Sequence, residues 1–550
     1  MNSKYNKLEL CWPSKDIEIK LEPRVLIEDP EKSYGESNTE NMLIHADNLL
    51  ALKALEQNFT GRIKCIYIDP PYNTGNAFEY YDDGLEHSIW LNLMHSRLQI
   101  LYKLLAKDGV LFVNVDEIEH AYLKVMLDEI FGRKNFIGDI IWKKRKGGGN
   151  DSRFIALDHD YIIVFAKNAT KETHKVKWRV SQSEQYLKRY KLIDENGDRY
   201  YWDTLSRDGL QNPIPISIDC PDGTILSINS QKSLDTIKEG LKNGNVKLTK
   251  SRNGWTLHHR VYKPAGQVMR SILEDVGTNK DANDETIELF GVNNAFDYPK
   301  PESLINKLIE LVTKKGDFVL DSFLGSGTTA AVAHKMERKW IGIELGQHCN
   351  THCLPRLKSV CEGTDQKGIS KSTDWKGGGG FKFYNIAPSL LNKDKYNQWI
   401  INPNYNAQLL AAAMARQEGF TYCPSEVVIW KQGFATENHF IFTTTNTITP
   451  NIVEQILSEL KPEESLRICC IAFKEECNDI SNRIEIKKIP EMILGKCEFG
   501  KEDYCTDNNI INMPIDPDKP IFIPSYVKPE VKPEPAKIKK DNNTPTKLYF

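Results

Sequence analysis

A carboxylate, two prolines and an aromatic residue directly follow a predicted buried strand. Residues 63–68 are rich in β-branched and aromatic side chains, and the next four residues are Asp69, Pro70, Pro71 and Tyr72. A proline biases the residue before it toward extended backbone, so Asp69 is expected to leave the carboxyl end of the strand in that conformation. Open α/β sheets bind their ligands at this edge. The tetrapeptide is therefore a candidate active site.

The tetrapeptide suits the activation of an amine attached to an aromatic ring. Such an amine is a poor nucleophile because its lone pair is delocalised into the ring. If the Asp69 carboxylate and the Pro70 carbonyl each accept one N–H, the lone pair is directed toward an electrophile. The two prolines fix that carbonyl and add no competing N–H, and Tyr72 offers a flat face on which an aromatic ring can stack.

A second strand-end motif lies in the later half of the chain. Residues 318–321 predict a strand, the loop that follows contains Gly325 and Gly327, and an Ala-rich helix comes next. The glycines permit close backbone approach, and the helix N-terminus offers free N–H groups to a ligand. Glu344 closes the next predicted strand, where nucleotide-binding folds place an acid on the ribose hydroxyls. A phosphate-loop ATPase is excluded because no Gly-Lys-Ser/Thr follows the glycines.

Together, the motifs at 69–72 and 323–327 resemble those of DNA methyltransferases that methylate amino groups with S-adenosylmethionine. The tetrapeptide precedes the cofactor loop, an order that resembles the β class, in which the target-recognition segment lies between the two motifs. Residues 45–76 are similar to the modification subunits of type III restriction-modification systems. The resemblance implies an α/β fold: a Rossmann-like methyltransferase sheet with an inserted target-recognition region and a C-terminal α+β domain.

The resemblance also implies roles for individual residues, and it requires no metal. Glu344 is expected on the cofactor ribose, Asp47 near the adenine ring, and Lys300 in the segment that closes the cofactor pocket. The implied catalytic residues are Asp69, Pro70, Pro71 and Tyr72. The remaining implied contacts to S-adenosylmethionine come from Asp321, Phe323, Gly325, Gly327 and Thr328.

The reaction implied by the resemblance is methyl transfer to the N6 amine of adenine in double-stranded DNA. Asp rather than Ser at position 69 favours adenine by resemblance, and N4 methylation of cytosine remains open because the same geometry serves any ring amine. A catalytically silent subunit that recognises DNA for a partner nuclease is the alternative from another class. Carbon-5 cytosine methylation is disfavoured because Cys65 lies inside a predicted strand. The implied partners are double-stranded DNA, a restriction endonuclease/helicase subunit and a second copy of the chain in a homodimer.

The net charge of −3 conceals a basic segment. Residues 131–190 carry fourteen Lys and Arg against six Asp and Glu, which suits the base of a DNA groove. The run Lys143, Lys144, Arg145 and Lys146 precedes three glycines, so a flexible basic loop that contacts phosphates is expected. A solvated charged loop explains the run equally well.

Composition predicts a cytoplasmic globular protein. No apolar run reaches the roughly 18 residues of a membrane helix, and the N-terminus lacks the apolar core of a signal peptide. Twelve cysteines without a regular framework favour a reducing compartment. Cys349, His352 and Cys353 have helical spacing, but no second ligand pair is in view, so we interpret the cysteines as packed in a core.

A length of 550 residues predicts roughly two to four domains. Seven segments are expected: an N-terminal extension (1–40), the catalytic half (41–168), the inserted target-recognition region (169–291), the cofactor-binding half (292–362), a Gly-rich linker (363–381), a C-terminal α+β domain (382–512) and a disordered tail (513–550). In the C-terminal domain, helices are expected at 407–417 and 450–460, and strands at 427–430, 440–444 and 466–473.

Overall fold

The structure is a computed structural model, and one compact unit, residues 1–505, contains every residue that it describes. The expected tail 513–550 lies outside the described residues. No helix among the described residues combines the length and apolar character needed to cross a membrane. The described residues are 9–17, 19–72, 83–147, 154–170, 178–181, 184–206, 209–252, 254–291, 296, 298–502 and 504.

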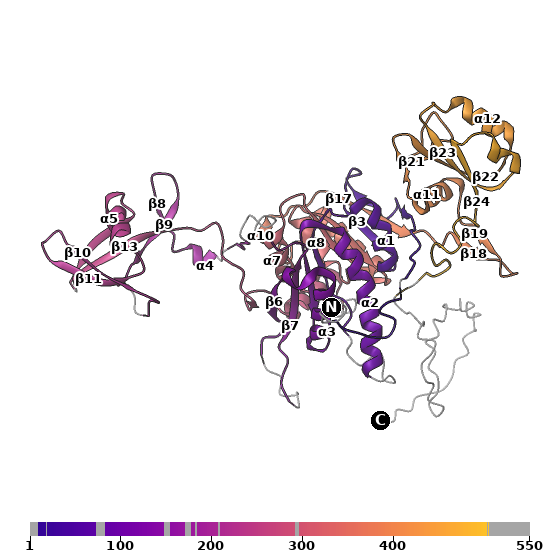
Figure 1. Ribbon diagram of the computed structural model, residues 1–550. Coiled ribbons are helices and arrows are strands. Elements are labelled where there is room, and N and C mark those ends of the chain that lie inside the picture. Colours follow the sequence, from indigo (N-terminus) through magenta and orange to yellow (C-terminus); the bar gives the residue numbers. More distant parts are fainter. Residues whose placement is uncertain are drawn as a thin grey trace, which may run out of the picture. The chain divides into compact units, whose positions relative to one another are not determined.

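An 11-stranded mixed sheet is the largest sheet among the described residues (Figure 1). Its strands, in spatial order, are β1 (Leu26–Glu28), β17 (Gly380–Ile386), β3 (Met42–His45), β16 (Lys339–Glu344), β15 (Phe318–Asp321), β4 (Ile63–Ile68), β5 (Leu105–Val115), β7 (His159–Ala166), β6 (Phe136–Lys143) and β14 (Ile272–Leu273), with β2 (Tyr34–Gly35) on β17. The run from β17 to β5 is parallel, and β7 is antiparallel to both of its neighbours. The expected α/β sheet is confirmed.

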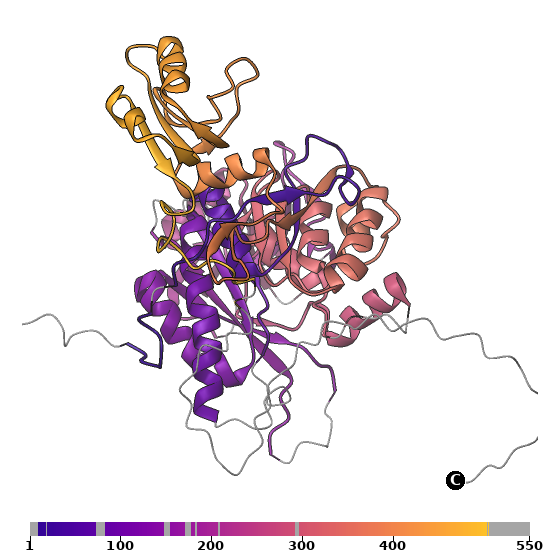
Figure 2. The same ribbon diagram turned by 90° about the vertical axis from the view of Figure 1, so that its right-hand side faces the viewer.

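Helices cover both faces of the sheet (Figure 2). One layer contains α1 (Asn48–Phe59), α2 (Asp83–Leu104) and α3 (Glu117–Leu127). The other contains α7 (Glu302–Val312), α8 (Thr328–Lys335) and α9 (Leu354–Glu362). Strands buried on both faces read as continuous apolar runs rather than alternating ones, which is why the pattern at 63–68 predicts its strand correctly.

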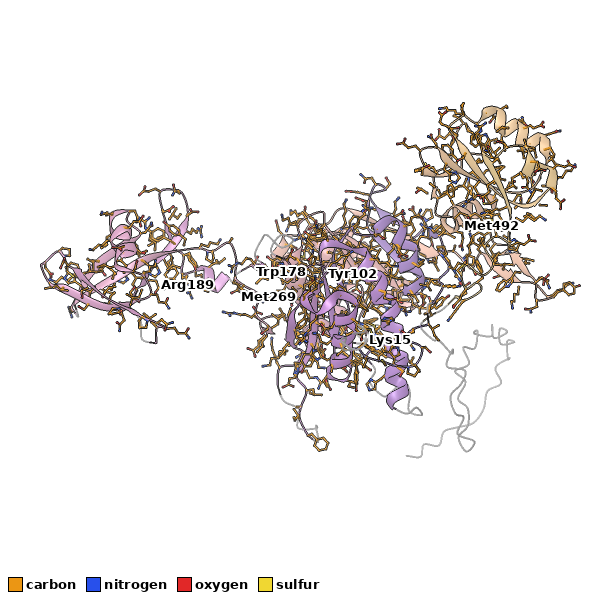
Figure 3. The ribbon with its side chains drawn as sticks, in the orientation of Figure 1. Lys15, Tyr102, Trp178, Arg189, Met269 and Met492 are labelled. Carbon is orange, nitrogen blue, oxygen red and sulfur yellow. The ribbon has the colours of Figure 1, made fainter. Side chains whose placement is uncertain are left out.

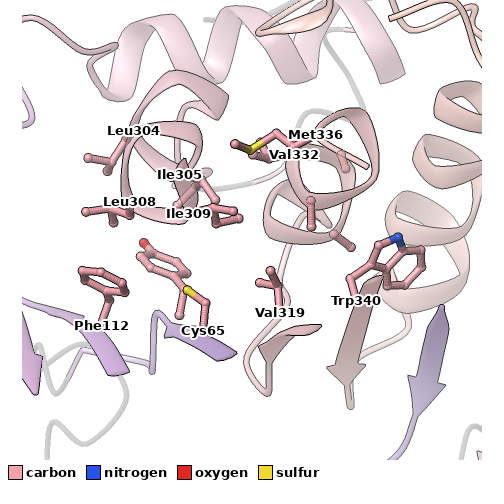
Figure 4. Close-up of a cluster of buried hydrophobic side chains, with 14 of the residues drawn as sticks. Cys65, Phe112, Leu304, Ile305, Leu308, Ile309, Val319, Val332, Met336 and Trp340 are labelled. Carbon is pink, nitrogen blue, oxygen red and sulfur yellow. The ribbon is translucent and has the colours of Figure 1, made fainter. Parts of the chain in front are cut away.

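Figure 4 shows how α7 closes one face of the core. Leu304, Ile305, Leu308 and Ile309 share one side of this helix and are fully buried. They lie over the sheet strands, among residues such as Phe112. Their i, i+3, i+4 spacing is the pattern of an amphipathic helix. The start of α7 is thereby fixed, and Lys300 lies two residues before it.

The inserted region has a small core of its own, between Leu205 and Leu257. Its elements are α4 (Glu184–Leu187), β8 (Leu192–Ile193), β9 (Arg199–Thr204), β10 (Ile214–Asp219), β11 (Ile225–Ser230), α5 (Leu234–Lys242), β12 (Val246–Ser251) and β13 (Gly254–Tyr262). Val180 and Gln267 form an isolated antiparallel β-bridge, in which each amide donates to the other residue's carbonyl, where the chain leaves and rejoins the central sheet. Trp178 and Met269, just outside this bridge, pack against the central core (Figure 3). The insertion is therefore shorter than predicted, because β14 and α6 (Asn279–Phe290) follow the bridge.

Two predicted segments, the Gly-rich linker and the N-terminal extension, belong in part to the central sheet, because both contain residues that pair through β17. Residues 377–380 are no linker: Gly378 N–H donates to Cys361 O, and β17, which begins at Gly380, pairs with β3 in the central sheet. A Cβ on Gly35 would lie 2.2 Å from the Gly379 carbonyl oxygen, so these glycines permit close packing rather than flexibility. Within the N-terminal extension, β1 and β2 pair with β17.

The C-terminal domain follows β17 and has its own cores. The helices α11 (Ala407–Gln417) and α12 (Pro450–Glu459) confirm the prediction, as do β22 (His439–Ile448) and β23 (Ser465–Phe473). Residues 427–430 form bends and turns instead of the predicted strand; Val427 is 88% exposed there, because apolar composition alone does not supply a pairing partner. The other strands are β18 (Leu391–Lys393), β19 (Trp399–Ile401), β20 (Thr421–Tyr422), β21 (Gly433–Thr436) and β24 (Ile484–Lys488).

A buried ion cluster joins α7, α8 and α9. The Glu302 carboxylate accepts from Lys335 Nζ at 2.9 Å and from Arg356 Nη2 at 2.8 Å, and Lys335 Nζ lies 2.9 Å from Asp365 Oδ2. All four side chains are at most 1% exposed. Buried charges are tolerated only when they are paired and hydrogen-bonded. The cluster therefore fixes the three helices relative to one another.

We expect Lys335→Met to lower the free energy of unfolding by about 3–5 kcal/mol, because it leaves the buried Asp365 carboxylate without its cation and Glu302 with Arg356 alone. Lys315→Met is the matched control: Lys315 pairs with Glu337, and both side chains are more than half exposed, so its effect should stay below about 1 kcal/mol. Urea unfolding followed by circular dichroism measures both. Equal losses for the two variants would contradict the structural role of the cluster.

Candidate active site

Asp69 lies directly after β4, and three donors hold its carboxylate. Lys300 Nζ is 2.5 Å from Oδ2, the Tyr72 hydroxyl is 3.1 Å from Oδ1, and Asn114 Nδ2 is 3.3 Å from Oδ1. Ionised groups make the stronger hydrogen bonds, so Lys300 is the dominant partner. The structure thus brings Lys300, predicted only near the cofactor pocket, onto the predicted catalytic carboxylate.

Tyr72 is held from a second side by Asp160, a buried residue of β7. The Tyr72 hydroxyl lies 3.3 Å from Asp160 Oδ2, and Lys144 Nζ neutralises Asp160 at 2.6 Å. Burial, followed by the Asp69 and Asp160 charges, raises the pKa of Tyr72 well above its ordinary value. The phenol therefore stays protonated and acts as a donor. Lys300 Nζ also lies 5.3 Å from the centre of the Tyr72 ring.

The two prolines between Asp69 and Tyr72 have different surroundings. Pro70 is buried and Pro71 is exposed. The Pro71 carbonyl accepts from Trp90 Nε1 of α2 at 2.8 Å, which fixes the direction in which the chain leaves the strand. The tetrapeptide is therefore restrained at both ends, by hydrogen bonds to side chains of α2, β5 and β7.

The glycine loop lies at the end of β15, the strand that pairs with β4. Gly325 and Gly327 have φ angles of +56° and +81°, a region that side-chain-bearing residues rarely adopt. The Gly325 N–H donates to Glu344 Oε2 at 2.7 Å, and Glu344 Oε1 lies 2.8 Å from His348 Nε2. Burial alone would raise the pKa of Glu344, but His348 and the amides of Gly346 and Gly325 hold it below its ordinary value.

Asp321 organises the first turn of this loop. It is 3% exposed; Oδ1 accepts from the Phe323 amide at 2.9 Å, and Oδ2 accepts from the Thr329 hydroxyl at 2.6 Å. Burial raises the pKa of the Asp321 carboxyl to about 7, despite these two hydrogen bonds. Its charge therefore changes near neutral pH.

The loop is also tied to the ion cluster below it. Arg356 Nη1 donates to the Thr328 hydroxyl at 2.8 Å and to the Ser326 carbonyl at 3.3 Å. Phe323 packs against the helix layer of α1 to α3. Ser322 Oγ is buried and has no hydrogen-bond partner among the described residues. An unsatisfied buried hydroxyl next to a glycine loop fits a polar ligand.

Asp47 has a structural role at the same edge of the sheet. It caps α1, accepting from Leu50 N–H at 3.0 Å, and it also accepts from Tyr504 N–H at 3.0 Å and from Arg97 Nη2 at 3.5 Å. Its side chain is fully buried. The structure thus places Asp47 beside the loop but gives its carboxylate three protein donors.

The basic run at 143–146 is divided between two environments. Arg145 and Lys146 are exposed, as a phosphate-contacting loop requires. Lys143 lies 3.6 Å from Glu274. Lys144 is turned to the active site by its pair with Asp160, with 15% of its side chain exposed, so it belongs with Tyr72 rather than with the exposed loop.

The predicted packing of the cysteines agrees with the structure. Cys349 and Cys353 are fully buried in the central core, and Cys353 Sγ lies 3.0 Å from the Gly325 carbonyl. The His352 ring packs edge-on against Phe290 and Phe296 instead. Across the described ranges, no group of three or more potential ligands could hold a metal ion.

Sequence reasoning missed Asn114 and Asp160. Both lie near the ends of strands that the sheet order β4–β5–β7 brings to the same edge. Asn114 is fully buried, its Nδ2 contacts Tyr72 and Asp69, and its Oδ1 has no partner among the described residues. The available sequence signal for Asn114 was a polar residue inside an apolar strand, because polar side chains are mostly exposed and a buried one is informative.

A comparison with protein families shows which family the chain belongs to. The family model described as DNA methylase matches residues 63–351, a range that contains both strand-end motifs. The chain belongs to the N6/N4 family of DNA methylases. Asp69 and the glycine loop are therefore the two halves of one methylase fold.

Individual relatives of this DNA methylase carry restriction-modification names. The probable type III restriction-modification enzyme HindVI Mod subunit of Haemophilus influenzae is 34% identical over 64% of this chain and 54% of its own length. The StyLTI Mod subunit of Salmonella typhimurium is 32% identical over 53% and 49%, and the EcoP15I Mod subunit of Escherichia coli is 25% identical over 70% and 71%. The chain thus spans about half the length of the first two relatives.

We expect Asn114→Leu to lower the turnover of this methylase roughly 10- to 100-fold, because it removes a donor shared by Asp69 and Tyr72 and leaves both less well oriented. Binding of S-adenosylmethionine should change less than threefold, about 0.6 kcal/mol, because Asn114 contacts the tetrapeptide rather than the glycine loop. Single-turnover transfer and calorimetry separate the two effects. Full turnover in the variant would remove Asn114 from the site.

Proposed function

We propose that this chain transfers a methyl group from S-adenosylmethionine to the N6 amine of adenine in double-stranded DNA. One observation supports this proposal above all: the Asp69 carboxylate and the glycine loop follow β4 and β15, which are paired, parallel neighbours. An amine acceptor and a loop suited to a nucleoside cofactor thus share one edge of the sheet, at the carboxyl ends of its strands, where such folds bind ligands.

The cofactor is assigned to the loop at 321–328 and to Glu344. Ser322 Oγ lacks a partner among the described residues, and Gly325 and Gly327 have the positive φ angles of a loop that favours glycine. Glu344 lies at the end of β16 with a pKa that keeps it ionised, as acceptance of ribose hydroxyls requires. When bound, S-adenosylmethionine supplies the electrophilic methyl carbon.

The tetrapeptide binds and orients the target amine. The Asp69 carboxylate and the Pro70 carbonyl each accept one N–H, which localises the nitrogen lone pair. When the nitrogen takes the methyl group, the S–C bond would break with its electron pair left on sulfur, and the nitrogen would gain positive charge. The fixed negative charge of Asp69 stabilises that change until one amine proton is released to solvent. Lys300, Tyr72 and Asn114 hold the carboxylate in place, and the Tyr72 ring offers a stacking face to the extruded base.

DNA and a nuclease chain are the partners of this proposal. Arg145 and Lys146 are exposed and suit contacts to phosphates, and the insertion between the two motifs is assigned to target recognition. Relatives named as Mod subunits of restriction-modification enzymes support a modification role, with restriction supplied by a separate endonuclease/helicase subunit. A homodimer is part of the same proposal, and light scattering of the purified chain tests it.

The deciding experiment incubates the purified chain with labelled S-adenosylmethionine and duplex DNA and identifies the modified nucleoside by mass spectrometry. N6-methyladenine is the expected product. N4-methylcytosine would establish the alternative target, and DNA binding without any transfer would establish the silent recognition subunit.

Asp69→Ala should lower transfer roughly 10²- to 10⁴-fold by removing the amine acceptor, while affinity for S-adenosylmethionine stays near normal. Asp108→Ala is the control: this acid of β5 is 46% exposed and pairs with Lys64, so transfer should be unchanged. Retention of activity within a few-fold in Asp69→Ala would exclude Asp69 from the mechanism.

Cofactor affinity should depend on pH through Asp321. Its pKa of about 7 in the free protein means that raising the pH from 6 to 8 ionises the carboxyl, and a negative charge favours the cationic cofactor. Affinity should therefore rise over this window, by at most roughly tenfold per pH unit, and level off above it. Calorimetry on Asp321→Asn, a neutral isostere, corrects for the titration of the cofactor itself. Identical pH profiles for the two proteins would contradict the prediction.

A further inference from the structure

One face of the sheet β12–β13–β9–β8 carries aromatic and cationic side chains. Strand register places Tyr200 and Trp202 of β9 opposite Tyr262 and Arg260 of β13, with Lys247 of β12 beside them. The opposite face contributes Leu257 and Val246 to the small core beneath α5 (Figure 1). None of the strand residues that share the aromatic face is acidic. The face therefore carries cationic side chains and flat rings, of which Tyr200 is buried.

Arg260 is held over this aromatic group. Its guanidinium carbon lies 4.8 Å from the Tyr200 ring centre and 5.6 Å from that of Trp202, and Nη1 donates to the Tyr262 hydroxyl at 3.4 Å. Lys247 Nζ lies 4.3 Å from the centre of the Trp202 ring. Stacking restrains a guanidinium while leaving its in-plane N–H groups directed outward.

Arg260 forms no direct ion pair within the described part of the chain; its hydrogen bond to Tyr262 and, from farther away, the charge of Asp194 raise its pKa. No carboxylate there lies within ion-pair distance of its guanidinium, and its buried Nε has no hydrogen-bond partner. Asp194, in the turn between β8 and β9, accepts hydrogen bonds from the amides of Asn196 and Asp198 at 3.0 and 2.8 Å, and it also interacts with the Tyr262 hydroxyl. A positioned cation with unused donors is suited to an anionic partner that offers paired acceptors.

We propose that this face reads DNA sequence, with Arg260 as the specificity-determining residue that recognises the major-groove edge of a guanine. The proposal rests on the proposed function in so far as DNA is the partner. Guanine offers the O6 and N7 acceptors side by side, and the arginine fork matches this pair in a way that the point charge of lysine does not. Lys247, on the same face, supplies a contact to phosphate that carries no sequence information.

The test is selection of bound sequences from a random duplex library by the full chain, so that it does not depend on methyl transfer. The wild-type protein should select a motif that contains at least one guanine. Arg260→Ala should relax one guanine position roughly five- to hundred-fold, with the other positions unchanged. Arg260→Lys should relax the same position while keeping affinity for non-specific DNA, because it keeps the charge and loses the fork.

Arg199→Ala is the matched control. Arg199 is exposed and precedes Tyr200 on β9, so its side chain lies on the other face of the sheet. Its loss removes the same charge from that other face, so the selected motif should not change. Replacing the selected guanine with 7-deazaguanine removes only the N7 acceptor, and this should weaken wild-type binding but leave Arg260→Ala unaffected.

Three results would overturn the proposal: an unchanged motif in Arg260→Ala, equal weakening at every position, or the same relaxation in Arg199→Ala. Circular dichroism of each variant confirms that it is folded, and Arg260→Lys carries the test if the alanine variant does not fold. Absence of methyl transfer would contradict the proposed function but not this inference, since binding selection measures it separately.

Discussion

The buried Glu302 carboxylate is the constraint on which both halves of the site depend. It receives Lys335 from α8, Arg356 from α9 and the Ile369 amide, and it stands in the first turn of α7, where a negative charge is also favourable. Arg356 supports Thr328 in the glycine loop, and Lys300, two residues before Glu302, holds Asp69. A buried charge that loses a partner is costly. One carboxylate therefore links the support of the glycine loop, through Arg356, to the segment that carries Lys300 to Asp69.

The elements that could be predicted from the sequence are those whose signal is local. The strands at 63–68 and 161–166 are apolar runs with clear ends, and the helices at 407–417 and 450–460 have apolar residues at helical intervals. Pairing between distant strands leaves no such trace. The antiparallel direction of β7 and the membership of β17 in the central sheet depend on contacts with strands far away in sequence, and a glycine run indicates flexibility and close packing equally well.

The residues of the candidate site likewise divide into those with a local sequence signal and those that depend on pairing between distant strands. Asp69, Asp321 and Glu344 each follow or end a recognisable strand, so their common edge could be inferred from a parallel sheet. Asn114 and Asp160 reach that edge only because β5 and β7 lie next to β4 in the sheet order, which no motif encodes. Lys144 illustrates the limit of composition: it stands in a basic run, yet its partner is the buried Asp160, and only the fold distinguishes it from Arg145.

The inserted region and the candidate site are built on separate cores, and this separation has a physical consequence. The small core from Leu205 to Leu257 shares no residue with the two clusters that flank the central sheet, and the Val180–Gln267 bridge closes the connection between them. Substitutions far apart and without shared partners add independently, so a change on the insertion's sheet leaves the packing around Asp69 and the glycine loop intact. The acceptor geometry at Asp69, in contrast, is coupled through Lys300 and Glu302 to three helices. The fold thus allows variation on the insertion's sheet and restricts it around Asp69 and the glycine loop.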